Sequence, residues 1–158
     1  MISVSQITTQ IYLGSTPYNR DDIDYLVSNF SINSVLSLQS DFDLKRRKIP
    51  IQELEAYYRQ LGISFSRYGI RDFSVEDMAK KLYAPTQELN RQIELGKTVF
   101  VHCNSGICRA PSTVLAFLCR YSGHSLKEGL ALIRQKRPIV NPYVDAVMKT
   151  LEQLAKTD

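Results

Sequence analysis

The hydrophobic positions of this 158-residue chain fall into short runs and helical repeats that alternate along most of its length. Short apolar or alternating runs bounded by turn residues predict β-strands, whereas apolar positions three or four residues apart predict helices. The run at 98–103 is almost continuously apolar, which is typical of a central strand that is buried on both faces. The strands predicted in this way are residues 7–14, 33–38, 63–70 and 98–103.

Helical spacing fills the intervals between these strands and then continues to the end of the chain. Gly62 and Gly96 fit the ends of helices, and Ser125 followed by Glu128 fits the capping box that begins one. The predicted helices are residues 21–29, 51–61, 84–95, 110–121, 126–136 and 142–155. We therefore predict an α/β fold, in which a central, mostly parallel sheet of four to five strands is flanked by helices and the C-terminal half is helical.

Composition narrows the class of protein. A chain of 158 residues with 44% hydrophobic and 23% charged residues fits one domain, 1–158, with a substantial core. The net charge of +4 is small and the densest basic run, residues 45–48, is short, so nucleic-acid binding is not indicated. Three cysteines without paired spacing, and no segment typical of a signal peptide or membrane span, favour a cytoplasmic protein. We expect a monomer that binds neither nucleic acid nor membrane.

The stretch VFVHCNSGICRAPS, residues 99–112, joins a strand end, a short loop and a helix start. The backbone N–H groups between Cys103 and Arg109 can surround one small anion, and Gly106 allows the positive φ that such a loop needs. These amides, the helix dipole and Arg109 all favour the thiolate form of Cys103. We therefore predict that Cys103 is a nucleophile and that the loop binds phosphate through Asn104, Ser105, Gly106, Ile107, Cys108 and Arg109.

VHCNSGICR, a Cys-x5-Arg loop followed by a helix, resembles the active-site loop of the cysteine-dependent protein tyrosine phosphatase superfamily. IYLGSTP, SLKEGLALIRQKRP and NPYVDAVMKTLEQL are similar to segments of its dual-specificity branch. The resemblance implies hydrolysis of phosphotyrosine and phosphoserine or phosphothreonine in phosphoproteins, through a phosphocysteine intermediate and without a cofactor or metal. It implies a general acid on a loop before the cysteine, for which Asp72 is the candidate and Asp77 the alternative. It also implies that His102 supports the thiolate, although a buried structural histidine is an equally good description.

Part of the sequence resembles a subgroup with another substrate. Arg-Ala-Pro after the loop, GSTPYNRDDIDYL and SVLSLQSDFD are similar to the plant glucan phosphatases, so a phosphorylated glucan is the alternative substrate. The chain has no tryptophan, and LKRRKIP stands where that subgroup carries aromatic residues, which argues against sugar binding. Asp41 and Asp43, within QSDFD, are interpreted as bordering the pocket or capping a helix.

Two residues beside Arg109 could alter the chemistry that the resemblance implies. Ala110 stands where the family usually has Ser or Thr, whose hydroxyl helps the thiolate leave, so we expect a slower second step and accumulation of phosphoenzyme. Cys108 could fill space beneath the loop or trap an oxidised Cys103 as a disulfide, and both interpretations stay open.

Other functions remain as alternatives. A phosphate-binding protein without turnover is the alternative from a different class, and the combination of Cys103, Arg109 and Asp72 argues against it. An arsenate reductase would need further thiols, for which only Cys108 is a candidate. Phosphoinositide and mRNA triphosphate substrates are disfavoured because the loop contains no additional basic residue.

Overall fold

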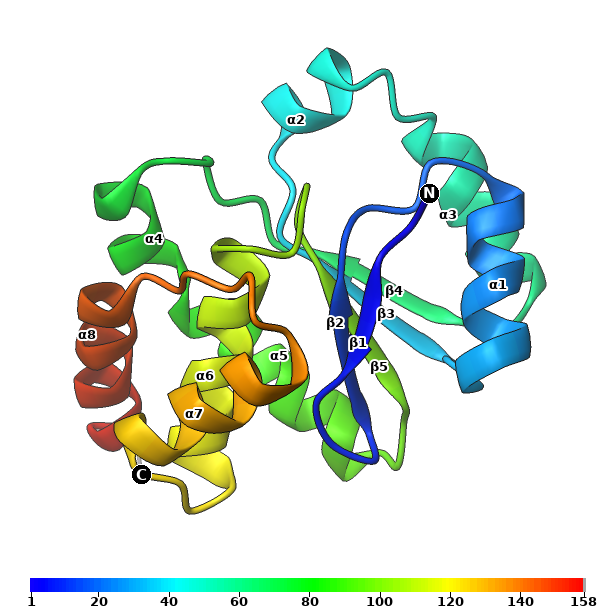
Figure 1. Cartoon of the computed structure of the whole chain (residues 1–158). Coiled ribbons are helices and arrows are strands. Elements are labelled where there is room, and N and C mark those ends of the chain that lie inside the picture. The colour runs from blue at the N-terminus through cyan, green and yellow to red at the C-terminus, as the bar shows by residue number, and fades with distance from the viewer. Residues whose placement is uncertain (158) are drawn as a thin grey trace.

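Residues 1–157, which the computed structural model describes, form a five-stranded sheet with helices on both faces (Figure 1). The strand order is β1-β2-β5-β3-β4. β1 and β2 are antiparallel, whereas the other neighbouring strands are parallel. The strands are β1 (Val4–Gln6), β2 (Ile11–Gly14), β3 (Ser34–Ser37), β4 (Ser64–Arg67) and β5 (Val99–His102). This arrangement confirms the predicted fold class and the central position of the strand that precedes the loop.

The helices divide between the two faces of the sheet (Figure 1). One face carries α1 (Arg20–Phe30) and α3 (Ile51–Gln60). The other carries α5 (Tyr83–Glu94), α6 (Arg109–Tyr121), α7 (Leu126–Lys136) and α8 (Val144–Ala155). Two short helices follow the carboxyl ends of β3 and β4: α2 (Asp41–Arg46) and α4 (Val75–Lys81).

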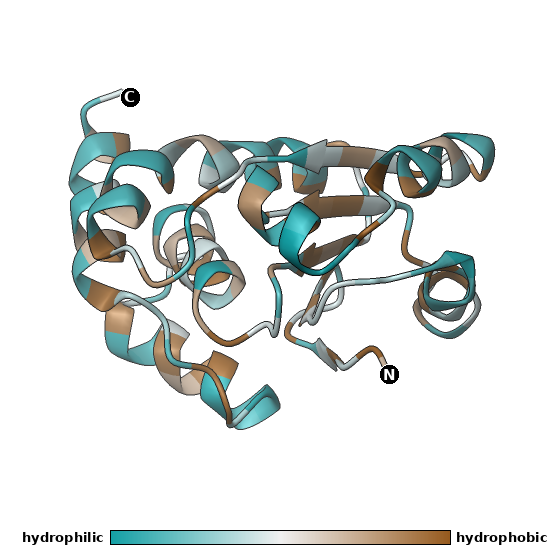
Figure 2. Cartoon of the chain, turned by 90° about the horizontal axis from the view of Figure 1, so that it is seen from above, coloured by the Kyte–Doolittle hydropathy of each residue, from teal (hydrophilic) through white to brown (hydrophobic). Residues whose placement is uncertain are grey.

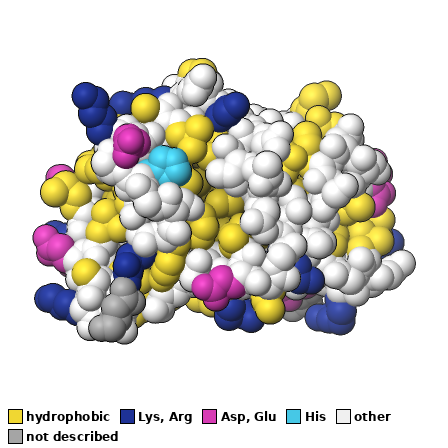
Figure 3. All heavy atoms as spheres, turned by 90° about the horizontal axis from the view of Figure 1, so that it is seen from below, with side chains coloured by type: hydrophobic (Ala, Val, Ile, Leu, Met, Phe, Trp, Pro, Cys, Tyr) yellow, Lys and Arg dark blue, Asp and Glu magenta, His cyan; other side chains and the backbone are white. Residues whose placement is uncertain are grey.

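The core lies in two layers because successive side chains of a strand point to opposite faces of the sheet. In β5, Val99 and Val101 pack into the layer beneath α6, whereas Phe100 packs into the layer beneath α1 and α3. Figure 2 shows the apolar residues concentrated on the strands and on the sides of the helices that face them. From below, basic side chains are spread around the margin of the molecule without forming one patch (Figure 3). Within the described chain, no helix combines the length and apolar character needed to span a bilayer.

The strand predicted at residues 7–14 is wrong in its first half. The structure has a tight turn there, in which the Thr8 hydroxyl accepts hydrogen bonds from the N–H groups of Gln10 and Ile11 at 3.2 and 3.0 Å. A threonine side chain that bonds to nearby backbone competes with the strand ladder. β1 and β2 are therefore two short strands on either side of this turn.

Two helices lie outside the predicted ones, and both begin at a serine cap. Ser40 forms a capping box with Asp43 at the start of α2. Ser74 accepts a hydrogen bond from the Asp77 N–H at the start of α4. Both helices are only one to two turns long, so neither presents the apolar repeat that identifies a longer helix.

Candidate active site

The loop at residues 103–108 lies at the carboxyl end of the central strand, between β5 and α6. β5 delivers Cys103 to the base of this loop, where its side chain is only 3% exposed. α6 begins at Arg109 and is almost entirely buried along the side that faces the sheet. The strand, loop and helix therefore have the order that the sequence predicted, and the thiol lies at the bottom of the loop.

The carbonyl groups of the loop are all held from the outside. Thr16 N–H donates to Asn104 O at 3.0 Å, and Asn141 N–H donates to Ile107 O at 2.6 Å. The Ser112 hydroxyl donates to Cys108 O at 2.7 Å. The N–H of each trans peptide points away from its C=O, so this arrangement turns the N–H groups of residues 105–109 inward. The result is a nest of amides suited to one tetrahedral anion.

Arg137, at the end of α7, holds the two remaining loop carbonyls. Its guanidinium donates to Gly106 O and Ser105 O, both at 2.9 Å. The same group donates to the hydroxyls of Ser3 and Ser5 at 2.9 and 3.1 Å, so it joins the loop to β1 and the residue before it. Arg137 is 3% exposed, and this burial lowers the pKa of its guanidinium. Sequence analysis did not assign it a role, because nothing local marks a basic residue near a helix end as a loop brace.

Gly106 is required at its position for two reasons. Its φ is 69°, and a Cβ atom placed there would lie 2.6 Å from the carbonyl carbon and oxygen of Gly14. Other residues rarely adopt this φ, and the backbone of β2 leaves no space for a side chain. The prediction that the loop needs a glycine with positive φ is therefore confirmed.

Arg109 is 1% exposed and its two sides have different surroundings. Nη1 donates to Asp43 Oδ2 at 2.6 Å and to Ile70 O at 2.7 Å. Nε and Nη2 are buried and make no hydrogen bond within residues 1–157, although Nη2 lies 3.2 Å from Asp72 Oδ2 as an ion pair. Buried donors are normally paired, so this free edge of the guanidinium is suited to two oxygens of a bound oxyanion.

Asp43 is the carboxylate that fixes Arg109. It is 4% exposed, accepts from Asn104 Nδ2 at 2.9 Å and is bound by Ser40 as well as Arg109. Burial acts most strongly on its pKa and would raise it, but the hydrogen bonds from Arg109, Ser40 and Asn104 together lower the pKa of this carboxyl. Asp43 takes part in the capping box of α2 and also contacts Arg109. Both alternatives given for it, bordering the pocket and capping a helix, therefore apply.

Asn104 extends this network away from the arginine. Its side-chain oxygen Oδ1 accepts from Gln39 Nε2 at 2.8 Å, and Gln39 Oε1 in turn accepts from the Thr16 hydroxyl at 3.2 Å. All three side chains are buried. The Asn104 side chain therefore serves the shape of the loop, whereas its N–H is not among the inward amides of residues 105–109. Phosphate binding by Asn104 stays a prediction.

The three other acidic candidates lie in different places. Asp72 is 24% exposed at the rim of the site, with Oδ2 3.2 Å from Arg109 Nη2. Asp77 lies in α4, accepts from the Arg71 N–H at 2.8 Å and pairs with Lys81. Asp41 is exposed and pairs with Arg67. Among residues 1–157, only Asp72 combines proximity to Arg109 with access to solvent, which favours it over Asp77 as the proton donor.

His102 and Cys108 stand at the two ends of the loop, His102 as the last residue of β5 and Cys108 just before α6. Burial lowers the pKa of His102 to about 4, so the ring is neutral near pH 7, with Nδ1 3.0 Å from Cys103 O. Burial, with the nearby charges of Cys103 and Asp72, raises the pKa of the Cys108 thiol. The neutral ring fits the structural interpretation of His102, whereas the structure shows Cys108 as a free, half-buried thiol.

Comparison with known proteins supports this interpretation of the site. Residues 11–156 match the family described as dual specificity phosphatase, catalytic domain. This chain belongs to the dual-specificity phosphatase family. The members of this catalytic-domain family are cysteine-based phosphatases, in agreement with the thiol, arginine and amide nest described above.

Its relatives include a phosphoglucan phosphatase and laforin. The phosphoglucan phosphatase DSP4 of Castanea sativa is 30% identical over 148 residues, which are 92% of this chain and 39% of that protein. Laforin of Mus musculus is 28% identical over 151 residues, covering 89% of this chain and 45% of that protein. The chain thus spans less than half the length of either relative. The crystal structure of PTPMT1 has the same fold, with a TM-score of 0.80 at 18% identity and 98% coverage of both chains.

Proposed function

We propose that this dual-specificity phosphatase hydrolyses phosphomonoesters on protein side chains, both phosphotyrosine and phosphoserine or phosphothreonine. The observation that carries the proposal is the Nε and Nη2 edge of Arg109, which makes no hydrogen bond within residues 1–157 and meets only the Asp72 carboxylate, beside a loop whose N–H groups turn inward above Cys103. A phosphate group offers acceptors for all of these donors at once.

The proposed reaction has two steps. The Cys103 thiolate attacks phosphorus in line, so that an S–P bond forms as the P–O bond to the leaving group breaks, and Asp72 gives its proton to that oxygen. Water then attacks the phosphocysteine, Asp72 takes a proton from it, and the thiolate and inorganic phosphate are released. Arg109 and the loop amides hold the phosphoryl oxygens through both steps.

A phosphorylated glucan is the second candidate substrate, and one observation favours it. Phe42 and Phe73 are 65% and 84% exposed, and each directly adjoins an acidic residue that contacts Arg109. Exposed aromatic rings at the rim of a phosphate site could stack on sugar rings. The similarity to a phosphoglucan phosphatase of Castanea sativa points in the same direction.

One set of rate measurements tests both substrates. The value of kcat/KM is measured for a phosphotyrosine peptide, a phosphothreonine peptide and a solubilised phosphoglucan, with Cys103→Ser as the inactive control. We expect hydrolysis of both peptides, and loss of all activity in the control. A preference for the glucan of tenfold or more would reject the protein substrate, and activity in the control would reject the nucleophile.

The role of Asp72 is tested by the leaving group. Asp72→Asn should slow hydrolysis of a phosphothreonine peptide far more than that of p-nitrophenyl phosphate, because the nitrophenolate leaves without needing a proton. An equal loss on both substrates would show that Asp72 acts in some other way.

A further inference from the structure

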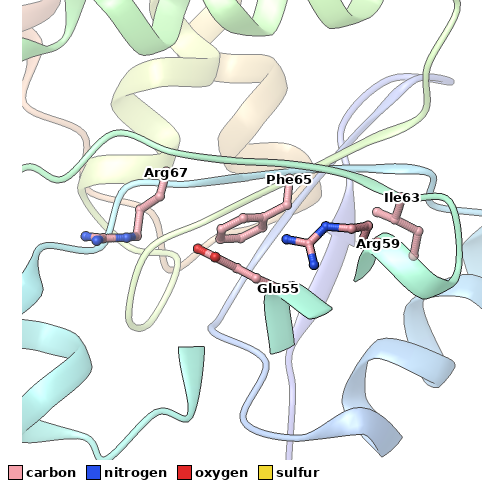
Figure 4. A pocket seen from close by; sticks show the side chains of 5 residues that line it. All are labelled: Glu55, Arg59, Ile63, Phe65 and Arg67. Atoms are coloured by element: carbon pink, nitrogen blue, oxygen red, sulfur yellow. The ribbon is translucent and has the colours of Figure 1, made fainter. Parts of the chain in front are cut away.

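Two hollows lie end to end along the outer strand β4. The first, of about 420 Å³, is lined by Glu55 and Arg59 of α3 and by three residues of the strand region, Ile63, Phe65 and Arg67. Figure 4 shows the Phe65 ring between Arg67 on one side and Arg59 on the other, with Glu55 below the ring. The second hollow, of about 610 Å³, also has Arg67 in its lining, so the two hollows adjoin at this side chain and are together called the groove below. Its lining residues are Ser40, Asp41, Phe42, Arg67, Gly69, Arg71, Asp77 and Lys81.

The floor of this groove follows an extended stretch of chain. The residues that β4 and its continuation contribute are 63, 65, 67, 69 and 71, which is the alternation of side chains on one face of a strand. Tyr68 and Ile70 still donate backbone hydrogen bonds to Ser37 and Leu38, so the extended course continues to residue 70. At about 3.3 Å per residue, the groove is roughly 25 Å long, which is the length of about eight residues of extended peptide.

One end of the groove opens beside the active site. Its wall at Asp41 and Phe42 directly precedes Asp43, which holds Arg109. Its floor at Arg71 directly precedes Asp72, which lies 3.2 Å from Arg109. A substrate whose phosphate occupies the amide nest can therefore continue directly into the groove.

Some charged side chains in the groove form ion pairs and others do not. Arg67 is paired with Asp41 at 2.8 Å, and Lys81 is paired with Asp77 at 3.0 Å. The guanidinium groups of Arg71 and Arg59 are exposed and make no ion pair or hydrogen bond with other residues of 1–157. The groove thus presents one free cation at the end near the active site and the Phe65 ring in its middle. Its far end holds the free cation of Arg59 together with the carboxylate of Glu55, which is unpaired within the described chain.

We propose that this groove binds an extended, acidic segment of a phosphoprotein substrate beside its phosphorylated residue. Arg71 contacts an acidic side chain close to the phosphorylated residue, and Phe65 takes an apolar side chain about six residues farther along. Arg59 contacts a second acidic side chain beyond it. The inference rests on the proposed protein phosphatase function and specifies which sequences that function prefers. Sugar rings suit this groove less well, because its two aromatic rings, Phe42 and Phe65, stand among seven charged residues.

The test uses three phosphotyrosine peptides with the same core. One has acidic residues on the N-terminal side, one has them on the C-terminal side, and one has neutral residues on both sides. We expect one of the acidic peptides to have a roughly fivefold higher kcat/KM than the neutral one, chiefly through KM, since each exposed ion pair contributes little. This ratio should fall as salt is added. Arg71→Glu should abolish or invert the ratio, and Arg59→Glu should reduce it.

Arg134→Glu is the matched control, because Arg134 is exposed on α7 and lies outside the groove. It should keep both the peptide ratio and the rate with p-nitrophenyl phosphate. Hydrolysis of all peptides without a preference for an acidic flank would overturn the proposed role of the groove, and so would a preference that survives Arg71→Glu. Neither result would contradict the proposal that the substrate is a phosphoprotein. Hydrolysis of phosphoglucan but of no peptide would instead reject the substrate class, and with it the groove.

Discussion

Replacement of Asp43 by asparagine tests whether this carboxylate orients the phosphate-binding arginine. Asp43 Oδ2 receives Arg109 Nη1 at 2.6 Å, and Oδ1 receives Asn104 Nδ2 at 2.9 Å. An asparagine has nearly the same shape but replaces one of these acceptors by a donor. Whichever way its amide turns, one donor then faces another donor, and Arg109 loses its best-buried negative partner.

The expected magnitude follows from that single lost contact. A hydrogen bond to a charged group contributes about 1.5–3 kcal/mol, so the free energy of unfolding should fall by about this amount. For a domain of this size, each kcal/mol lowers Tm by roughly 2–4 °C. If the free edge of Arg109 also turns away from the phosphate, the same energy lost in the transition state lowers kcat/KM by roughly 10- to 100-fold.

The assay measures Tm, kcat/KM for p-nitrophenyl phosphate and the inhibition constant of inorganic phosphate. The matched control is Asp21→Asn, since Asp21 is an exposed residue in the first turn of α1. We expect Asp43→Asn to weaken phosphate inhibition and lower kcat/KM, and the control to change neither. Tighter phosphate inhibition would refute the reasoning, because it would mean that Asp43 competes with the substrate for Arg109. A value of kcat/KM within threefold of wild type would refute it as well.

Four further predictions concern residues around the loop. Arg137→Lys should lower both Tm and kcat, because one ammonium cannot reach the two loop carbonyls and two hydroxyls that the guanidinium joins; thermal melting and steady-state kinetics measure this. His102 has a depressed pKa of about 4, so the stability that it contributes is complete above about pH 6.5 and is lost as pH falls towards 4. About 2 kcal/mol should be lost by pH 5, and His102→Gln should show a smaller drop in Tm between pH 7.5 and 5. Peroxide-treated enzyme should regain activity with dithiothreitol more completely in wild type than in Cys108→Ser. Formation of the Cys103–Cys108 disulfide should still be accelerating at pH 9, because the pKa of the Cys108 thiol is raised and its thiolate is scarce below that pH. Rapid-quench kinetics should show a burst of leaving group, which Ala110→Ser reduces by speeding the second step.

Each of these four predictions has an outcome that contradicts it. A normal kcat in Arg137→Lys would show that the loop keeps its shape without the guanidinium. Equal pH dependence of Tm in His102→Gln and wild type would place the titrating group elsewhere. Equal recovery of Cys108→Ser and wild type would remove the disulfide. A progress curve without a burst would mean that the second step is not slowed at Ala110.

The sequence predicted the parts of this site that are local in the chain. The run at 98–103, the glycine at 106 and the cap at Ser125 each depend on neighbours a few residues away, and all three lie where they were expected. The loop and the nucleophile candidate followed directly from such features. The turn at Thr8 was missed because a hydroxyl bonding to nearby backbone leaves no mark on the hydrophobic pattern.

The remaining parts depend on contacts between distant segments. Asp43 reaches Arg109 across 66 positions of the chain, and Arg137 reaches Ser105 across 32. A pattern of residue types carries no information on which of several acidic or basic side chains will meet after folding. The groove along β4 is of the same kind, since it brings α3, α2 and α4 to one strand.

The bridge made by Arg137 links the phosphate-binding loop to the start of the chain. Its guanidinium donates to the hydroxyls of Ser3 and Ser5 and to the carbonyls of Ser105 and Gly106. A change at Ser3 or Ser5 therefore alters the support of the loop through one buried side chain, although neither serine belongs to the loop. The first strand thus supports the phosphate-binding loop as well as the sheet.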